Sequence, residues 1–176
     1  LSVKAYKKSI VVYSQSEMEE KKPVKKLKRA DFVDDSWQYA DALTGVYTGA
    51  RISYKPGGGS EEISVYVGEK DEEAKDSRVL FLNEAADSIS DAYRKAAAAV
   101  NKSNQEATTL SGDIWPDPKI CAGVTVEISG LGKADGKYFV DKCTTEVGNS
   151  KTRQSVEMHK CQKRLSQEPK PQEETA

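Results

Sequence analysis

The glycine-rich segment "GLGKADGK", residues 130–137, has the composition of a phosphate-binding loop. Such loops hold phosphate with backbone N–H groups at the start of a helix. The residue after Lys137 is neither serine nor threonine, and the glycines are spaced G-x-G-x-x-x-G, so neither the triphosphate nor the dinucleotide motif is present. The next residues alternate as a strand, and an Asp-Gly pair is typical of hairpins. We therefore predict a turn between two strands. The residues expected to set its backbone shape are Gly130, Gly132, Asp135 and Gly136.

The sole histidine, His159, and the three cysteines are candidate ligands for a Cys₃His zinc site. His159 and Cys161 share one face of a predicted strand, and Cys143 lies in a neighbouring predicted strand. Structural zinc sites usually take ligands in pairs from C-x₂₋₄-C segments, which this sequence lacks. An odd number of cysteines without an export signal also favours reduced thiols. We predict no metal site and expect Cys121, Cys143 and Cys161 to be buried or half-buried.

Catalytic groups are sparse. The sequence has no G-x-S-x-G segment, and its one histidine has no recognisable nucleophile beside it. Asp113 and Asp117 could be read as a pair of catalytic carboxylates, but they flank a proline-containing loop, where acidic residues commonly form turns. We predict that the chain is not an enzyme and binds no cofactor.

The charges are balanced, with 27 basic and 28 acidic residues among 176. This balance gives no overall field that would attract nucleic acid. The basic segment 21–29, "KKPVKKLKR", lies between acidic segments and is interpreted as a solvated face rather than a phosphate-binding patch. No apolar run approaches the roughly 20 residues that span a bilayer. We predict no membrane insertion.

Four side chains are candidates for contact with other subunits. Trp37 and Trp115 could be interface anchors, because aromatic rings carry much of the energy at protein contacts, although a core position fits both residues equally well. Lys133 and Lys137 lie at the solvent end of the predicted turn, where a neighbouring subunit could meet them.

Alternating apolar residues predict a series of short strands. A short helix, "SEMEEKK", is predicted to end before Pro23. The segment "KPGGGS" is the expected tip of a hairpin and a candidate subunit contact. The strands are predicted in segments 2–13 (two strands), 46–54, 61–69, 107–112, 124–128, 138–140 and 152–163.

One long helix is predicted over residues 88–104. Its apolar residues repeat at helical spacing, and Ser88 with Asp91 forms a start that resembles a capping box. The alanines make this face small, so the helix can lie close to a sheet. The side chains expected to dock it are Ile89, Tyr93 and Val100.

These elements predict an α+β, β-rich fold: an antiparallel, barrel-like domain with one long helix and a small N-terminal layer of strand and helix. Tyr138 and Val140 are expected in the barrel core. The predicted divisions are a small α/β segment, residues 1–35, that is the remainder of a truncated domain; a barrel-like domain, residues 36–166, with the helix of residues 88–104 inserted; and a disordered tail, residues 167–176.

The order of these elements resembles the C-terminal part of the late control protein D family, the baseplate hub proteins of contractile phage tails and of phage-tail-like bacteriocins. The resemblance rests on "LSVKAYKKSIVVY", on "YTGARISY" with its glycine-rich tip, and on "FLNEAADSISDAYRKAAAAVNKSN". The strongest match is "LSGDIWPDPKICAGVTVEISGLGKADGKYFVDKCTTEV", with its glycine hairpin and following strand.

The resemblance implies that the barrel-like domain is the second barrel of a tail hub. It implies a homotrimeric ring that adapts the six-fold tail tube to the three-fold spike. Tube, spike and other baseplate proteins would be its partners, and the particle would assemble in the bacterial cytoplasm and remain part of the virion tail or tail-like particle. The alternative is a β-rich module that binds a ligand, such as cell-wall glycan, without catalysis.

Overall fold

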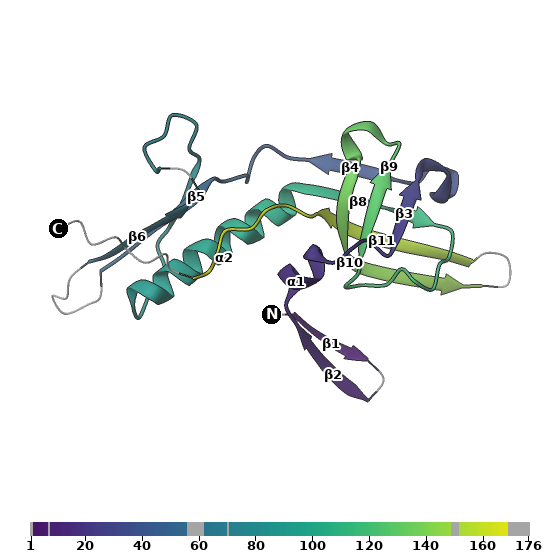
Figure 1. Ribbon diagram of the computed structural model, residues 1–176, viewed down its shortest axis with the longest axis horizontal. Helices are drawn as coiled ribbons and strands as arrows, with labels where there is room; N and C mark the ends of the chain where they lie inside the picture. Colours follow the sequence, from purple (N-terminus) through teal and green to yellow (C-terminus); the bar gives the residue numbers. More distant parts are fainter. Residues whose placement is uncertain (1, 7, 56–61, 70, 149–151, 169–176) are drawn as a thin grey trace. The chain divides into compact units, whose positions relative to one another are not determined.

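The computed structural model describes residues 2–6, 8–55, 62–69, 71–148 and 152–168 (Figure 1). The chain forms two compact units, each built from segments that are distant in sequence. The barrel unit consists of Leu1–Asp41 and Thr108–Gln162, and the helix–sheet unit consists of Ala42–Ala107 and Lys163–Ala176. The β-rich α+β class predicted from the sequence is confirmed. No helix in the described ranges is long and apolar enough to cross a membrane.

The barrel unit contains a six-stranded sheet with the order β3-β9-β10-β11-β8-β4. β3 runs parallel to β9, and the other neighbours are antiparallel. The edge strands β3 and β4 are joined by two short turns, η1 (Arg29–Asp31) and η2 (Val33–Asp35), between which Phe32 bridges to Ile114. The strands are β3 (Lys25–Lys28), β4 (Gln38–Asp41), β8 (Thr108–Ile114), β9 (Thr125–Ser129), β10 (Gly136–Val147) and β11 (Thr152–Lys160).

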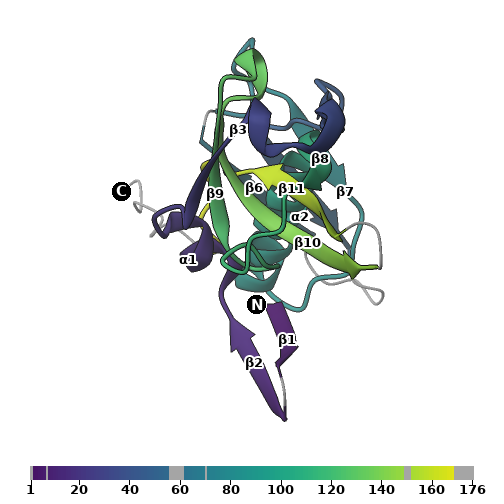
Figure 2. The same ribbon diagram turned by 90° about the vertical axis from the view of Figure 1, so that its right-hand side faces the viewer.

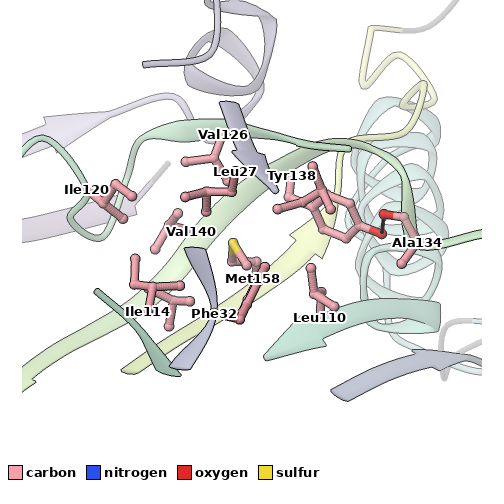
Figure 3. Close-up of a cluster of buried hydrophobic side chains, with 12 residues drawn as sticks. Leu27, Phe32, Leu110, Ile114, Ile120, Val126, Ala134, Tyr138, Val140 and Met158 are labelled. Carbon is pink, nitrogen blue, oxygen red and sulfur yellow. Dashed lines mark hydrogen bonds between the residues drawn. The ribbon is translucent and has the colours of Figure 1, made fainter. Parts of the chain in front are cut away.

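One hydrophobic core fills the concave side of this sheet (Figure 3). Every second residue of a strand points to the same face, so alternation places one apolar set inside. Leu27 from β3 and Phe32 from the connection between the edge strands join side chains from the central strands, and the sheet thereby curves around its own core. The buried members are Leu27, Phe32, Leu110, Ile114, Ile120, Val126, Ile128, Ala134, Tyr138, Val140, Val156 and Met158.

The N-terminal part of the barrel unit is a two-stranded hairpin followed by a short helix. β1 (Ser2–Tyr6) and β2 (Ser9–Tyr13) are antiparallel, and α1 (Gln15–Glu20) comes next (Figure 2). The chain after α1 joins the barrel through Thr125, whose Oγ1 donates to the Lys21 carbonyl at 3.2 Å and whose carbonyl accepts the Val24 N–H at 2.8 Å. These elements occupy the segments in which two strands and a helix were predicted.

The helix–sheet unit packs one long helix on a three-stranded sheet. The sheet order is β6-β5-β7, in which β5 (Gly49–Tyr54) is antiparallel to β6 (Ile63–Gly68) and parallel to β7 (Val79–Leu82). The helix, α2 (Ile89–Ala107), covers this sheet with its alanine-rich face. Small side chains let the helix and sheet approach closely, and Ala50, Ala96 and Ala97 are fully buried between them.

The predicted domain boundaries differ from the observed units. β3 lies in the segment 1–35 that was assigned to a separate layer, but its hydrogen bonds to β9 make it part of the barrel sheet. The hairpin β5–β6 and the helix were assigned to the barrel, but they form their own unit because the apolar face of β5 is buried by α2. The predicted tip "KPGGGS" from residue 56, and the predicted disordered tail from residue 169, lie outside the described residues.

Candidate assembly site

The segment 130–137 contains the turn between β9 and β10, residues 130–135, followed by the first two residues of β10. Gly130, Gly132 and Gly136 have φ values of +83°, +68° and +143°, which L side chains rarely adopt. The Asp135 carboxylate accepts the N–H of Gly130 at 3.0 Å and of Leu131 at 2.6 Å. These backbone hydrogen bonds lower the pKa of Asp135 and close the turn around one carboxylate. The only helical element in the turn is the single 3₁₀ turn η3 (Gly132–Ala134).

Tyr138 joins this turn to the barrel core. Its ring is fully buried, and its hydroxyl donates to the Ala134 carbonyl at 2.9 Å (Figure 3). Burial raises the pKa of Tyr138, so the phenol remains protonated. Val140 lies two residues further along β10 in the same core. A register shift between Val140 and Lys142 marks a β-bulge that bends this long strand.

Replacing Gly136 with alanine is expected to destabilise the barrel unit by about 1–3 kcal/mol, the usual cost of a strained backbone conformation. An added Cβ would also lie 2.8 Å from Cε of Lys160, which must move. Urea unfolding measures the change, with Lys133→Ala in the same turn as the exposed control. Equal unfolding midpoints for the two variants would contradict the role of Gly136.

The four predicted contact residues lie in different surroundings. Trp37 packs against the barrel core, whereas Trp115 is 60% exposed. Lys133 is exposed at the turn, and Lys137 is half-buried, with its carbonyl accepting the Cys161 N–H at 2.8 Å. Trp115 and Lys133 are therefore the exposed members of this set.

The residues predicted to dock the long helix are only partly those that do so. Val100 is fully buried against the sheet, and Tyr93 packs at the border of the same cluster. Ile89 is 63% exposed, so the prediction that it docks the helix is wrong. At the start of the helix, Ala92 packs with Ala86 from the preceding segment and with Ile52 from β5. Ile89 is not part of that cluster.

His159 is the polar residue whose role the sequence did not show. Its ring is buried in the barrel unit, 5.3 Å from the ring centroid of Phe139. Nδ1 lies 2.7 Å from Oδ2 of Asp141 in β10, and Nε2 lies 3.0 Å from Oε1 of Glu19 in α1. Burial lowers the pKa of His159, but hydrogen bonds and charge interactions with Asp141 and Glu19 outweigh burial and raise it overall. A protonated imidazole donates to both carboxylates and ties α1 to the sheet.

Three of the other candidate groups for metal binding or catalysis, Cys143, Asp117 and Asp113, have structural partners. Cys143 Sγ accepts a hydrogen bond from Gln154 Nε2 at 3.1 Å. Asp117 binds Lys25 Nζ at 2.6 Å, and this hydrogen bond is the main reason that the pKa of Asp117 is lowered. Asp113 accepts a hydrogen bond from Ser155 Oγ at 2.5 Å.

The three cysteines differ in burial. Cys121 is exposed, contrary to its predicted burial, while Cys143 and Cys161 are half-buried. Within the described residues, no three His, Cys, Asp or Glu side chains are grouped to hold a metal ion.

The fold is similar to that of part of two phage tail proteins. In particular, the chain is similar to the 43 kDa tail protein of prophage MuSo2 from Shewanella oneidensis, with 13% identity and a TM-score of 0.62 over 81% of this chain and 45% of that chain. It is also similar to the tail protein from Neisseria meningitidis MC58, with 12% identity and a TM-score of 0.57 over 80% of this chain and 45% of that chain. The chain thus spans less than half the length of either structure. No protein-family model and no curated protein matches the sequence.

Proposed function

We propose that the chain is a structural component of a phage tail or tail-like particle, and specifically the C-terminal part of a baseplate hub protein. The likeness to two tail proteins covers about 80% of the chain and supports this proposal. Each unit alone contains fewer residues than that, so the likeness includes residues of both units. The polar groups that were candidates for catalysis also fit a structural role. His159 contacts Glu19, Asp113 accepts a hydrogen bond from Ser155, and Asp117 pairs with Lys25.

In this proposal, three copies form a ring that adapts the six-fold tail tube to the three-fold spike. Such a ring needs head-to-tail contacts between different surfaces of neighbouring copies. Its partners are the tube protein, the spike protein and other baseplate proteins, and assembly takes place in the bacterial cytoplasm. Surface charges of both signs, 27 basic and 28 acidic residues in the chain, suit contacts whose register is set electrostatically.

The full-length protein is expected to have the mass of a trimer in solution and to bind purified tube and spike proteins. Light scattering after size exclusion measures the mass, and co-sedimentation measures the binding. Bovine serum albumin provides the negative control for co-sedimentation. A monomer at all concentrations that binds neither protein would overturn the proposed function.

Exposed Trp115 favours one second candidate, a module that binds cell-wall glycan. An exposed aromatic ring can stack on a ligand. Of the two tryptophans, Trp37 packs against the core, so Trp115 is the one that could bind a glycan. Titration with soluble peptidoglycan fragments discriminates between the functions. A saturable change in tryptophan fluorescence that Trp115→Ala abolishes would support the glycan module, and no change is expected for the hub.

A further inference from the structure

The short helix α1 is attached to the barrel sheet through a buried pair of ionisable groups. Glu19 is the buried residue of this helix, and its side chain is 7% exposed. Its Oε1 lies 3.0 Å from Nε2 of His159 in β11. Met18, the apolar side chain of α1, is only half-buried. The buried attachment of α1 is thus an ionic contact rather than an apolar one.

The geometry of the His159 ring requires a proton on both nitrogens. Nδ1 lies 2.7 Å from Oδ2 of Asp141 and Nε2 lies 3.0 Å from Oε1 of Glu19, so each nitrogen faces a carboxylate oxygen. An ionised carboxylate only accepts hydrogen bonds, and a neutral imidazole carries a single N–H. Loss of one proton from the ring therefore leaves a nitrogen lone pair facing a carboxylate.

Glu19 bears the larger cost of this loss. Asp141 is 40% exposed and can turn to water, whereas Glu19 is almost completely covered. Whichever nitrogen keeps the remaining proton, the ring no longer supplies a positive charge to Glu19. A buried carboxylate without a compensating cation is strongly unfavourable, so the neutral ring favours a state in which Glu19 reaches water.

α1 can leave the barrel without disturbing the sheet. Residues 21–24 connect it to β3, and the N–H of Val24 at the end of this connection donates to the Thr125 carbonyl at 2.8 Å. Isolated helices shorter than about 12 residues are marginal in water, and α1 has six residues. Release of Glu19 is therefore expected to unfold α1, while the chain from Val24 onward remains paired with β9.

We propose that protonated His159 is a latch that holds α1 on the barrel sheet, and that loss of its proton releases and unfolds α1 while the sheet remains folded. The β1–β2 hairpin is connected to β3 through α1, so the same step uncouples the hairpin from the sheet. The charges that act on the ring come from Asp141 of β10 and Glu19 of α1, and β8 places the uncharged Thr109 opposite His159. This latch does not depend on the proposed hub function.

The latch has a defined direction with pH. Burial lowers the pKa of His159 in the attached state, but hydrogen bonds and charges from Asp141 and Glu19 raise it overall. Release removes the contact with Glu19, so the attached state binds the proton more tightly. The equilibrium constant for release should therefore rise with pH, by up to about tenfold per pH unit for one proton, and level off above the pKa of the attached state.

Hydrogen exchange of the wild-type chain measures the release. The amides of Met18 and Lys21 donate to carbonyls of the α1 segment at 3.2 Å each. Their protection, corrected for the intrinsic pH dependence of exchange, is expected to fall about tenfold per pH unit as the ring loses its proton. The amides of Gly123 and Val140 donate within the barrel at 2.8 and 2.9 Å and should keep constant protection. NMR gives the ring midpoint without ambiguity, because His159 is the only histidine.

Two conservative variants separate a latch from a purely structural contact. In Glu19→Gln, the amide is uncharged and can donate to or accept from the ring, so α1 protection should become independent of pH while His159 still titrates. Glu20→Gln is the matched control, an exposed carboxylate on the same helix, and should retain the wild-type dependence. Asp141→Asn removes a charge that raises the pKa of His159, so the midpoints of the ring and of release should both move to lower pH.

The wild-type measurement decides the proposal even if a variant does not fold. Protection of α1 that stays constant while the ring titrates overturns the latch. A folded Glu19→Gln variant with the same pH dependence as the wild type also overturns it. Loss of α1 protection at the ring midpoint, with constant protection of Gly123 and Val140, supports the latch, and parallel shifts of both midpoints in Asp141→Asn support it further.

Discussion

Replacing His159 with leucine is expected to lower the free energy of unfolding of the barrel unit by about 3–5 kcal/mol, the usual cost of removing one partner from a buried ionic cluster. The imidazole donates to Asp141 at 2.7 Å and to Glu19 at 3.0 Å, and Glu19 is itself buried. Leucine fills a similar volume but leaves the two carboxylates facing each other without the cation. Chemical denaturation followed by circular dichroism measures the loss.

The matched control is Lys142→Ala. Lys142 pairs with Glu157 at 2.8 Å between the same two strands, but both side chains are mostly exposed. Exposed pairs contribute little, so its unfolding midpoint should remain close to that of the wild type. The role of His159 is refuted if His159→Leu is no less stable than Lys142→Ala. Limited proteolysis near α1 provides a second readout, because α1 loses its ionic link to the sheet.

The contribution of His159 is also expected to depend on pH. The pKa of His159 is raised in the folded state, so the folded protein binds the proton more tightly than the unfolded chain, whose histidine titrates near pH 6.5. The stabilisation is complete below about pH 6.5 and decreases as pH rises through the folded-state pKa. The stability difference between wild type and His159→Leu should therefore narrow from pH 6.5 to pH 9. A difference that stays constant over this range argues against a protonated His159.

Truncating Tyr138 is expected to produce a comparable loss. Tyr138→Ala removes a fully buried ring from the barrel core and should cost about 3–5 kcal/mol, as large-to-small changes of aromatic residues do. Tyr138→Phe keeps the ring but loses the hydrogen bond to the Ala134 carbonyl at 2.9 Å, at a cost of about 1 kcal/mol. Urea unfolding of the two variants separates packing from the hydrogen bond.

Val147→Ala is the control for Tyr138 because Val147 lies on the same strand and is 81% exposed. Its unfolding free energy should be close to that of the wild type. Equal losses for Tyr138→Ala and Tyr138→Phe would show that the hydroxyl, and not the ring, carries the stabilisation. That result would contradict the core position as the main source of stability.

Local features of the sequence were sufficient to predict most elements of the fold. The alternation in "VTVEIS" and "KYFV" predicts the strands on either side of the turn, and Asp135 with the three glycines predicts the turn itself. Helical spacing predicts α2, although the helix continues to Ala107, three residues beyond the predicted end. Signals of this kind depend on neighbours a few residues apart, so a single sequence reveals them.

The partners of these elements could not be predicted in the same way. Residues 21–29 were interpreted as a solvated basic face in a separate layer, but Lys25–Lys28 form β3 with Leu27 buried. The helix α2 with β5 and β6 was placed in the barrel, because alternation is the same in every strand and does not name the strand that pairs with it. The cluster around His159 was missed for the same reason. Glu19 is 140 residues away from His159 in the chain, and no local pattern links them.

The sequence by itself determined the β-rich class, the Asp-Gly turn, the alanine-rich helix and the lack of a recognised catalytic motif, since each follows from residue types at short spacing. Only the tertiary structure decided that the chain divides into two units, that Ile89 and Phe81 face solvent, and that His159 lies between two carboxylates. These outcomes depend on which distant segments pair and pack. The free energy of burial and hydrogen bonding across the whole chain selects that pairing.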